Sequence, residues 1–594
     1  LTRLDYRGYD SWGVASMAQE NGGAPLSAQH FFVEKDKGMV PASDQIEAPK
    51  SYVAIGHTRW ATHGSVTKNN AHPHLSSEGS FALAQNGIVG NFVELKKELI
   101  TKGYRFTTQT DTEVIVRLVE EMIKKGGSLV EAVRRAFTKI EGRNTVIVLA
   151  KDGSIITARN GSPMVIGLDF GKSGAGKKNP ELSSLENIYF SSDTLSFAGA
   201  ATHILVLDNG QMAVCAGAEL EITSIKSGKK AKVEPVLSTM VAEEVNKEGF
   251  DHFMVKEIHE TPSTLKAVIQ QEKEEFNNLV VAVKKAKNVY TLGSGTAGIA
   301  AAQIAYYLRS IAQVQTISLI GAESDSYFNL FKKGDLIIAP SQSGETADVL
   351  EVLEIAKEKG VKIATLVNMQ GSMMSRMSDY PFMAKAGPEM CVMSTKVFVA
   401  QIAFGYYLAH AVAGNAEKGE KNIESVAEKI ETYLADSAQL EKISDVASSL
   451  VKVNDIFLLG KSQNVSIVQE GMVKLIEGSY KHAHGIPAGD LKHYAITILE
   501  KGVPVIFALS NDSVLSDVMN AAHEVKARGA TVIGIGYCKD QQGVFDTTIP
   551  LPDTGDTSGI FNVVVLQLLA YFLTVKLGNN VDKPRNIAKS VTVK

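Results

Sequence analysis

The feature that most constrains the fold is an alternation of apolar strands and helices that begins after about residue 255 and occurs twice. The first copy predicts helices from about 297 and at 347–359 and strands at 288–295, 335–340 and 361–367. The second predicts helices from about 464 and at about 513–528 and strands at 455–460, 503–510 and 530–536. Such alternation is typical of parallel, doubly wound α/β sheets, which bind ligands beyond the carboxyl ends of their strands.

The first 225 residues have a different pattern, with short strands and few helices. It predicts helices at about 91–102 and 111–125 and strands at 52–56, 81–84, 145–150 and 204–207. This mixture indicates an α+β domain built from layered sheets. Residues from about 226 to 250 show little periodicity, so we expect the domain boundary there.

Composition narrows the function classes. The 594 residues are enough for two to four domains, and 44% hydrophobic with 21% charged residues is ordinary globular composition. A net charge of −4 gives no electrostatic reason to expect nucleic acid or an anionic membrane as partner. Three cysteines, none at C-x-x-C spacing, favour a cytoplasmic protein without a disulfide framework. The apolar stretch 561–575 is too short to span a bilayer and predicts a core helix.

A candidate phosphate site lies at residues 341–346, between a buried strand and a helix. Hydroxyls, free backbone N–H groups and a helix N-terminus would converge there, as a phosphate requires. The alternative is a simple helix cap made by Ser343 and Thr346. The equivalent turn of the second copy carries the acidic Asp512, so we expect one phosphate site per chain. The glycine-rich turn 293–298 lacks the full dinucleotide fingerprint and is expected to approach the same phosphate.

A candidate acid–base group lies on one helix. Glu470, Lys474 and Glu477 share one helical face. The pattern alone favours a solvated stripe of ion pairs. The segment 482–493 that follows contains Gly, Pro and several titratable groups, and this composition favours an active-site loop. No histidine pair has the spacing of a metal site, so no metal is expected.

In the first domain, three short motifs stay ambiguous when read singly. Arg59 follows a strand and could hold a carboxylate, although such an arginine is usually on the surface. Asn86 and Gly87 could form a type I′ hairpin turn or an oxyanion hole. Residues 110–113 look like a helix N-cap, which would leave Asp111 able to meet an ammonium group.

Together these motifs resemble the glutamine–fructose-6-phosphate aminotransferase (isomerizing) family, the glucosamine-6-phosphate synthases. The resemblance runs from residues 3–10 to residues 582–592. It implies an N-terminal-nucleophile glutaminase domain at 1–225, a linker at 226–254 and two sugar isomerase (SIS) domains at 255–430 and 431–594. Ammonia from glutamine would convert fructose 6-phosphate into glucosamine 6-phosphate, the first step of hexosamine synthesis. No cofactor is implied, and the family implies at least a homodimer with sites completed across subunits.

The resemblance also assigns roles to residues. In the glutaminase domain it implies substrate binding by Arg59, Thr62, His63 and Asp111, an oxyanion hole of Asn86 and Gly87, and Trp60 at the mouth of an ammonia channel. In the synthase half it implies phosphate binding by Ser341, Gln342, Ser343 and Thr346, with Val392 and Ser394 near the sugar. Ring opening would fall to His493, the Schiff base to Lys589, and proton transfer between C1 and C2 to Glu477, supported by Lys474 and Glu470.

Some residues depart from the family pattern. The family's nucleophile is an N-terminal cysteine, yet this chain has none before Cys215, and we expect that about twenty residues precede Leu1 in the full protein. Gln85, Ala297 and His484 replace a usual His, a phosphate-binding Ser and a Glu, and residues 494–495 replace a usual Gly-Pro. Two alternatives therefore stay open: an SIS enzyme for another phosphosugar, such as a deglycase or an ammonia-dependent synthase, or a non-catalytic phosphosugar-binding regulator.

Overall fold

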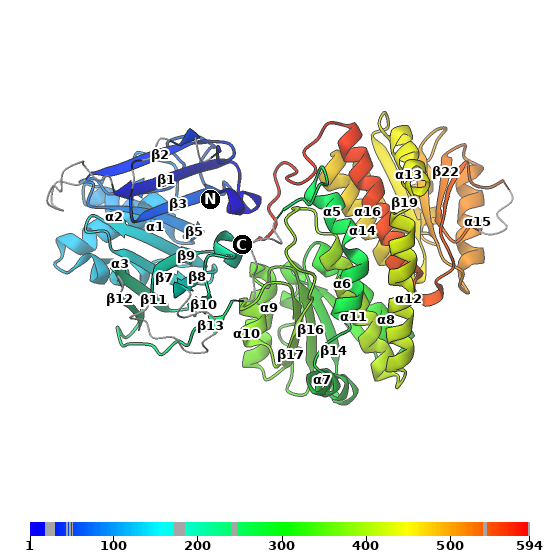
Figure 1. Ribbon diagram of the computed structural model, residues 1–594, viewed down its shortest axis with the longest axis horizontal. Helices are drawn as coiled ribbons and strands as arrows, with labels where there is room; N and C mark the ends of the chain where they lie inside the picture. The colour runs from blue at the N-terminus through cyan, green and yellow to red at the C-terminus, as the bar shows by residue number, and fades with distance from the viewer. Residues whose placement is uncertain are drawn as a thin grey trace. The chain divides into compact units, whose positions relative to one another are not determined.

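The computed structural model divides the chain into two compact units, and each is described by itself (Figure 1). Unit 1 contains Leu1–Glu244 with Ser590–Lys594, and unit 2 contains Val245–Lys589. The structure describes residues 1–17, 30–42, 45–46, 49, 51–171, 185–217, 219–238, 246–538 and 543–591, and only the backbone of residues 5–7.

The described residues of unit 1 form three antiparallel sheets and three α-helices. One sheet has the order β2 (Phe31–Lys37), β1 (Ser11–Met17) and β3 (Ala54–Arg59). The largest has the order β12 (Glu219–Ser224), β11 (Gln211–Ala216), β7 (Ile155–Asn160), β6 (Asn144–Ala150), β5 (Phe81–Gly87) and β4 (His74–Leu75). The third has the order β13 (Val236–Leu237), β10 (His203–Val206), β8 (Val165–Asp169) and β9 (Asn187–Ser191). The helices are α1 (Phe92–Thr101), α2 (Thr112–Lys124) and α3 (Leu129–Phe137).

The pleat of β5 explains how these layers stack. Phe81 and Leu83 join the core formed with the helices, whereas Ala82 joins a second core with residues of β1 and β3. Successive side chains of a strand point to opposite faces, so β5 is buried on both sides. The predicted layered α+β domain is therefore confirmed.

Three local expectations for unit 1 need correction. The strand expected at 52–56 is β3 and begins at Ala54. Asn86 and Gly87 are not a hairpin turn, because β5 runs through them and pairs with β6 at Thr145 and Asn144. The segment 226–254 includes β13, which pairs with β10. Residues 239–245 of that expected linker lie outside the described residues.

In the part of unit 2 that the structure describes there are two five-stranded sheets, and every paired strand in them is parallel. The first has the order β15 (Thr316–Ile320), β14 (Val289–Gly293), β16 (Leu336–Ser341), β17 (Lys362–Val367) and β18 (Tyr380–Met383). The second has the order β20 (His482–Pro487), β19 (Asp455–Gly460), β21 (Pro504–Leu509), β22 (Thr531–Gly536) and β23 (Thr547–Pro550). The two predicted doubly wound domains are thus confirmed, but His482–Pro487 is an edge strand and not a loop.

The helices of unit 2 cover these sheets and form its core. Their bounds are α5 (Phe253–His259), α6 (Thr261–Val268), α7 (Lys273–Lys285), α8 (Thr296–Ser310), α9 (Ala347–Glu358), α10 (Met373–Met377), α11 (Lys396–Val412), α12 (Ala416–Leu434), α13 (Ser437–Leu450), α14 (Val465–Ser479), α15 (Leu515–Lys526) and α16 (Ser558–Lys576). The expected boundary at residue 430 lies inside α12.

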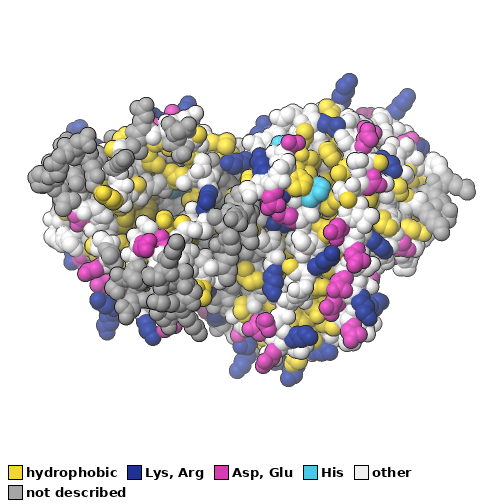
Figure 2. All heavy atoms as spheres, viewed as in Figure 1, with side chains coloured by type: hydrophobic (Ala, Val, Ile, Leu, Met, Phe, Trp, Pro, Cys, Tyr) yellow, Lys and Arg dark blue, Asp and Glu magenta, His cyan; other side chains and the backbone are white. Residues whose placement is uncertain are grey.

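The apolar stretch at 561–575 forms most of α16. The helical segment Gly555–Lys576 is long and apolar enough to cross a membrane, but 89% of its apolar window is buried inside the protein. It packs against α13 and α14 as a core helix. On the visible surface of the described residues, basic and acidic side chains are interspersed (Figure 2), as expected for a chain of small net charge.

Candidate active sites

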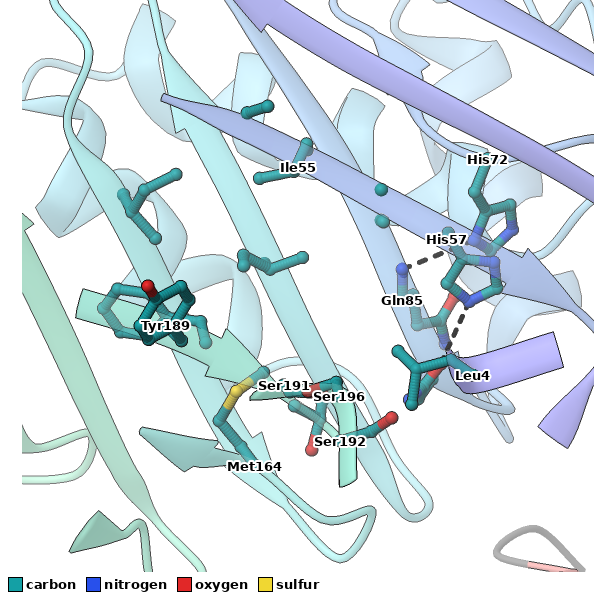
Figure 3. Close-up of a pocket in the computed structure, with 18 of the residues that line it drawn as sticks. Leu4, Ile55, His57, His72, Gln85, Met164, Tyr189, Ser191, Ser192 and Ser196 are labelled. Atoms are coloured by element: carbon teal, nitrogen blue, oxygen red, sulfur yellow. Dashed lines mark hydrogen bonds between the residues drawn. The ribbon is translucent and has the colours of Figure 1, made fainter. Parts of the chain in front are cut away.

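Unit 1 contains a cavity of about 880 Å³ where its sheets meet. Figure 3 shows His57 and His72 at one end of the view and Met164 and Tyr189 toward the other. The residues with a predicted role in glutamine chemistry all line it: Arg59, Trp60, Thr62, His63, Asn86, Gly87 and Asp111. Residues from three separate sequence motifs therefore converge on one space.

Arg59 ends β3 and is 4% exposed, so it is not the surface arginine that its position suggested. Its Nη2 donates to the carbonyl oxygens of His63 at 2.5 Å and Gly64 at 3.2 Å. Burial lowers the pKa of Arg59, while the nearby carboxylates of Asp10 and Asp111 oppose that shift. The hydrogen bonds to the 63–64 turn hold the guanidinium in one orientation, which suits recognition of a planar carboxylate.

Asn86 is oriented by a histidine. The Nε2 of His57 lies 2.9 Å from the Asn86 Oδ1, and because an amide oxygen only accepts, the ring nitrogen is the donor. The amide nitrogen of Asn86 is then directed away from His57 and can donate to another group. Gly87 has φ +126°, and a Cβ there would lie 2.1 Å from the carbonyl oxygen of Arg143, so only glycine fits beside Asn86.

Asp111 precedes α2 but does not cap it with its side chain. Its Oδ2 instead accepts the backbone N–H of Val89 at 2.8 Å. The carboxylate is 4% exposed and fixes the backbone two residues beyond Gly87. The predicted N-cap at 110–113 is therefore present, its Asp111 side chain is not used for capping, and this buried carboxylate lines the cavity.

A row of three histidines forms the wall behind Asn86. The ring centroids of His57 and His72 are 4.4 Å apart, and those of His72 and His74 are 4.9 Å apart. Burial lowers the pKa of His57 to about 4 and of His74 to about 3, and it lowers the pKa of His72 as well. The row is thus neutral at pH 7. Among the described residues, no group of three or more His, Cys, Asp or Glu side chains has the geometry of a metal site.

Gln85 takes part in a hydrogen-bond network that the sequence did not reveal. Its Nε2 donates to the Asn144 Oδ1 at 2.6 Å, and its Oε1 accepts the Thr112 hydroxyl at 2.5 Å. The side chain ties β5 to β6 and to the first turn of α2 and so fixes the strand that carries Asn86.

Cys215 on β11 also lines the cavity. Burial raises the pKa of its thiol, and the thiolate is the nucleophilic form of cysteine. The buried environment of Cys215 therefore disfavours the thiolate and does not activate this residue as a nucleophile.

In unit 2, the predicted phosphate loop joins β16 to α9. The Ser341 Oγ accepts the Gly344 N–H at 2.9 Å, and the Ser343 Oγ accepts the Glu345 N–H at 3.2 Å. Thr346 is the N-cap residue of α9, yet its side chain makes no capping hydrogen bond, which contradicts the simple cap interpretation for this residue. The loop wraps onto its own N–H groups at the N-terminus of a twelve-residue helix, a geometry that favours anions.

Glu470, Lys474 and Glu477 do not form a solvated stripe. Glu470 and Lys474 are 0% and 1% exposed, whereas the apolar Ile476 is 41% exposed. The Lys474 Nζ lies 2.5 Å from Glu477 Oε2 and 3.4 Å from Glu470 Oε1. The Thr296 hydroxyl donates to the same Glu470 oxygen at 3.2 Å and so links this cluster to the glycine-rich turn of the first SIS sheet.

Burial and charge set the protonation of this cluster. Burial raises the pKa of Glu470 to about 8, although the charge of Lys474 opposes that shift. Burial disfavours the charge of Lys474, but Glu477 and Glu470 outweigh it and raise its pKa. At neutral pH the cluster therefore holds one ammonium, paired closely with Glu477, beside a neutral Glu470.

Lys589 is buried in an ion pair with Glu389. Its Nζ donates to the Glu389 Oε2 and, at 2.6 Å, to the carbonyl oxygen of Cys391. The residues predicted to lie near the sugar belong to the same segment. The Val392 N–H donates to the Asp582 carbonyl oxygen at 2.9 Å, and the Ser394 hydroxyl donates to Glu389 at 2.9 Å.

The segment 389–394 lies between the residues of unit 2 that have predicted roles. The Cys391 carbonyl oxygen accepts from Lys589, and a Cβ on Gly478, the residue after Glu477 on α14, would lie 3.4 Å from the Met393 Sδ. The Gln342 carbonyl oxygen accepts the Asn368 N–H, and Asn368 binds residues 386 and 387 just before that segment. His493 ends the 3-10 helix Leu491–His493 and is exposed. Among the described residues, no hydrogen bond or ion pair joins its side chain to Glu477 or Lys589.

Family models match three stretches of the chain. Residues 42–153 match the glutamine amidotransferase domain. Residues 282–411 and 449–577 each match the SIS domain. The first stretch contains the cavity residues with a predicted role in glutamine chemistry, and the other two contain the two parallel sheets of unit 2.

Curated relatives match the chain along its whole length. The glutamine–fructose-6-phosphate aminotransferases (isomerizing) of Caldanaerobacter subterraneus subsp. tengcongensis and Aquifex aeolicus are 34% and 35% identical to it, over 100% of this chain and 96% of theirs. The chain belongs to this aminotransferase family. That of Pyrobaculum aerophilum is 34% identical with the same coverage. The sequence resemblance is thereby confirmed.

Solved structures resemble unit 2. The C-terminal domain of glucosamine-fructose-6-phosphate aminotransferase from Francisella tularensis has a TM-score of 0.51 and 28% identity, over 57% of this chain and 100% of that one. A putative tagatose-6-phosphate ketose/aldose isomerase from Clostridium novyi NT has a TM-score of 0.52 at 15% identity, over 59% of this chain and 96% of that one. The second likeness shows that the fold is shared.

Proposed function

We propose that this member of the aminotransferase family transfers ammonia derived from glutamine to fructose 6-phosphate and isomerises the product to glucosamine 6-phosphate. The observation that carries the proposal is that the segment 389–394 contacts both the buried Lys589 and the helix α14 that bears the buried charge cluster, and lies close to the predicted phosphate loop. A protein that only binds phosphosugars needs the loop but not these charges. The arrangement therefore supports an enzyme over a binding regulator.

The residues divide the synthase chemistry among them. The loop 341–346 binds the phosphate, and Lys589 forms an imine with the ketone at C2. Ammonia then adds at C2 and displaces the Lys589 amine, so that the nitrogen of ammonia forms the imine at C2. This imine acidifies the hydrogen at C1, and Glu477 moves a proton from C1 to C2, which gives the 2-amino aldose. Lys474 holds Glu477 by its short ion pair, and the neutral Glu470 holds Lys474 without adding a second full negative charge.

In unit 1 we propose that Arg59 and Asp111 bind the two charged ends of the glutamine α-amino acid group. Asn86 and the Gly87 N–H then stabilise the oxyanion that forms at the amide carbon. Thr62, His63 and Trp60 complete the wall of the cavity. The partners we propose for the whole chain are thus small molecules.

We further propose a homodimer in the cytoplasm in which His493 of one copy serves the sugar site of the other. Support comes from its exposure and from the exposed apolar side chains of Tyr494 and Ile498 beside it, at 52% and 57%. Mixing two inactive variants, His493→Ala and Glu477→Gln, tests this arrangement. Restored activity in the mixture is expected, and a mixture that stays inactive while still dimeric contradicts it.

The proposed function is tested by supplying the two nitrogen sources separately. The chain is incubated with fructose 6-phosphate and either ammonium or glutamine, and glucosamine 6-phosphate is measured. Product from ammonium is expected, because the synthase residues are all present in unit 2. Bound fructose 6-phosphate without product from either source contradicts the proposed function. Product from ammonium alone identifies the glutaminase half, which has no cysteine before Cys215, as the inactive part.

A further inference from the structure

The predicted imine-forming Lys589 is held by a carboxylate that has no assigned role. The side chains of Lys589 and Glu389 are 1% and 0% exposed, and the lysine Nζ donates directly to the Glu389 Oε2. An amine attacks a carbonyl only when it is unprotonated. A buried ammonium in this position therefore needs a base within reach before it can react.

Glu389 is ionised beside Lys589 and is held in one orientation. Its Oε1 accepts the backbone N–H groups of Thr395 at 2.9 Å and Val397 at 3.1 Å, at the start of the seventeen-residue helix α11. Its Oε2 accepts the Ser394 hydroxyl as well as Lys589. Burial raises the pKa of Glu389, but Lys589 and these donors outweigh burial and hold the pKa below its usual value.

A second buried carboxyl group allows a comparison. Glu257 on α5 is 1% exposed, and its Oε1 accepts the N–H groups of Met390 and Cys391, the residues directly after Glu389. Burial, with the charge of Glu389, raises the pKa of Glu257 to about 8. Its Oε2 has no hydrogen-bond partner among the described residues. Glu257 is therefore a neutral structural group that holds the backbone, whereas Glu389 is ionised.

We propose that Glu389 is the acid–base residue that converts Lys589 from ammonium to imine and back. The inference rests on the proposed function, because it requires Lys589 to react with the ketone of the sugar. It adds a catalytic residue in direct contact with the reacting nitrogen.

Glu389 can accept and return the proton that imine formation requires. Glu389 takes a proton from the Lys589 ammonium, and the free amine forms a C–N bond to C2 while the carbonyl π electrons move to oxygen. One proton then moves from nitrogen to that oxygen, which gives a carbinolamine. Glu389 returns its proton to the hydroxyl, which leaves as water while C=N forms. The products are a protonated imine, one water and the original carboxylate.

Trapping the imine tests this role apart from overall turnover. The full chain is mixed with fructose 6-phosphate, borohydride is added after set times, and the reduced adduct on Lys589 is measured by mass spectrometry. The unmodified chain is expected to form the adduct, and the Glu389→Gln variant is expected to form it at least about 100-fold more slowly. The Kd for fructose 6-phosphate is expected to stay within about threefold, because Glu389 contacts the lysine and not the phosphate loop.

The matched control is Glu257→Gln, which replaces a carboxyl that is already neutral and keeps an oxygen to accept the two N–H groups. It is expected to form the adduct at the rate of the unmodified chain. Equal adduct rates for Glu389→Gln and the unmodified chain overturn the role of Glu389 but leave the imine step of the proposed function intact. No adduct in the unmodified chain, with the sugar bound, overturns the imine step of the proposed function and this role with it.

A rescue experiment separates acid–base chemistry from a merely structural role. Glu389→Ala opens space beside Lys589, and added formate can supply the missing carboxylate. Adduct formation that rises with formate concentration is expected in this variant and not in Lys589→Arg. A folded Glu389→Ala chain that binds the sugar and forms the adduct at full rate without formate overturns the proposal.

Discussion

The two candidate sites stabilise buried polar groups in different ways. In unit 1, a row of histidines lies beside Asn86, a proposed oxyanion residue, and is neutral because burial lowers the pKa values of its members. Unit 2 buries full charges and pairs them, as in Lys474 with Glu477 and Lys589 with Glu389. Removing two charges from water is costly unless they meet in good geometry.

This difference fits the chemistry proposed for each unit. Unit 1 has to bind an amino acid and stabilise an oxyanion with fixed donors, and a rigid neutral wall achieves that. Unit 2 has to move protons on and off a sugar, so it needs groups whose charge changes during the reaction. The comparison predicts that removing a buried charge is most damaging in unit 2, and that the stabilities of the two units respond oppositely to pH.

The largest expected effect comes from removing the cation of the buried cluster. Lys474→Met leaves Glu477 and Glu470 without their partner, and unit 2 should lose about 3–5 kcal/mol of stability. Its urea midpoint, followed by far-UV circular dichroism, should fall accordingly. The control is Lys461→Met, which removes a 34% exposed partner of Asp517 and should cost less than about 1 kcal/mol. Equal effects of the two variants would contradict the buried-pair description.

The next effect is a pH dependence of opposite sign in the two units. The unfolded chain binds protons at histidine below about pH 6.5, whereas folded His57 binds one only near pH 4. The contribution of His57 to the free energy of unfolding of unit 1 should therefore fall by about 3 kcal/mol as pH falls from 6.5 to 4. Folded Glu470 keeps its proton up to about pH 8, but the unfolded chain releases it above 4.5. Its contribution to unit 2 should therefore decrease as pH rises from 4.5 to 8.

The two units can be followed separately in that experiment. Both tryptophans, Trp12 and Trp60, belong to unit 1, so their fluorescence reports its unfolding alone. His57→Gln keeps a donor to Asn86 and should flatten the acid slope of unit 1. Glu470→Gln should flatten the alkaline slope of unit 2. If the stabilities of both units of the unmodified chain change with pH in the same direction, the proposed neutral states of His57 and Glu470 are ruled out.

A smaller effect is expected at the oxyanion residues. Gly87→Ala places a Cβ against the Arg143 carbonyl oxygen at a φ of +126°, and unit 1 should lose about 2–3 kcal/mol. Gly79→Ala is the matched control, because Gly79 has φ +62° with nothing within 4 Å of the added Cβ. It should cost only about 1 kcal/mol. Tryptophan fluorescence in urea measures both, and equal losses would show that close contact at Gly87 is unimportant.

The smallest effect concerns recognition by Arg59. Arg59→Lys keeps the charge but loses the planar pair of donors, so calorimetry should show about tenfold weaker glutamine binding. Arg135→Lys changes a 46% exposed arginine paired with Glu131 and should leave glutamine binding unchanged. Unaltered binding in Arg59→Lys would remove Arg59 from the proposed glutamine site.

Local sequence patterns predicted the architecture of unit 2 because strand–helix alternation is repeated in sequence. They failed at residues 482–487, where His, Gly and Pro are poor strand formers and only pairing with β19 makes an edge strand. They also misjudged α14, because helical spacing shows that three charges share a face but not that this face is buried. The contact of Glu389 with Lys589 spans 200 positions, and no local pattern indicates it.

The most direct test of the account is Glu477→Gln, measured for both product formation and sugar binding. If Lys474 and Glu477 form the reaction centre, glucosamine 6-phosphate formation from ammonium should fall by about 10²–10⁴-fold, while the Kd for fructose 6-phosphate stays unchanged. Full activity in this variant, or loss of sugar binding together with activity, would contradict that claim.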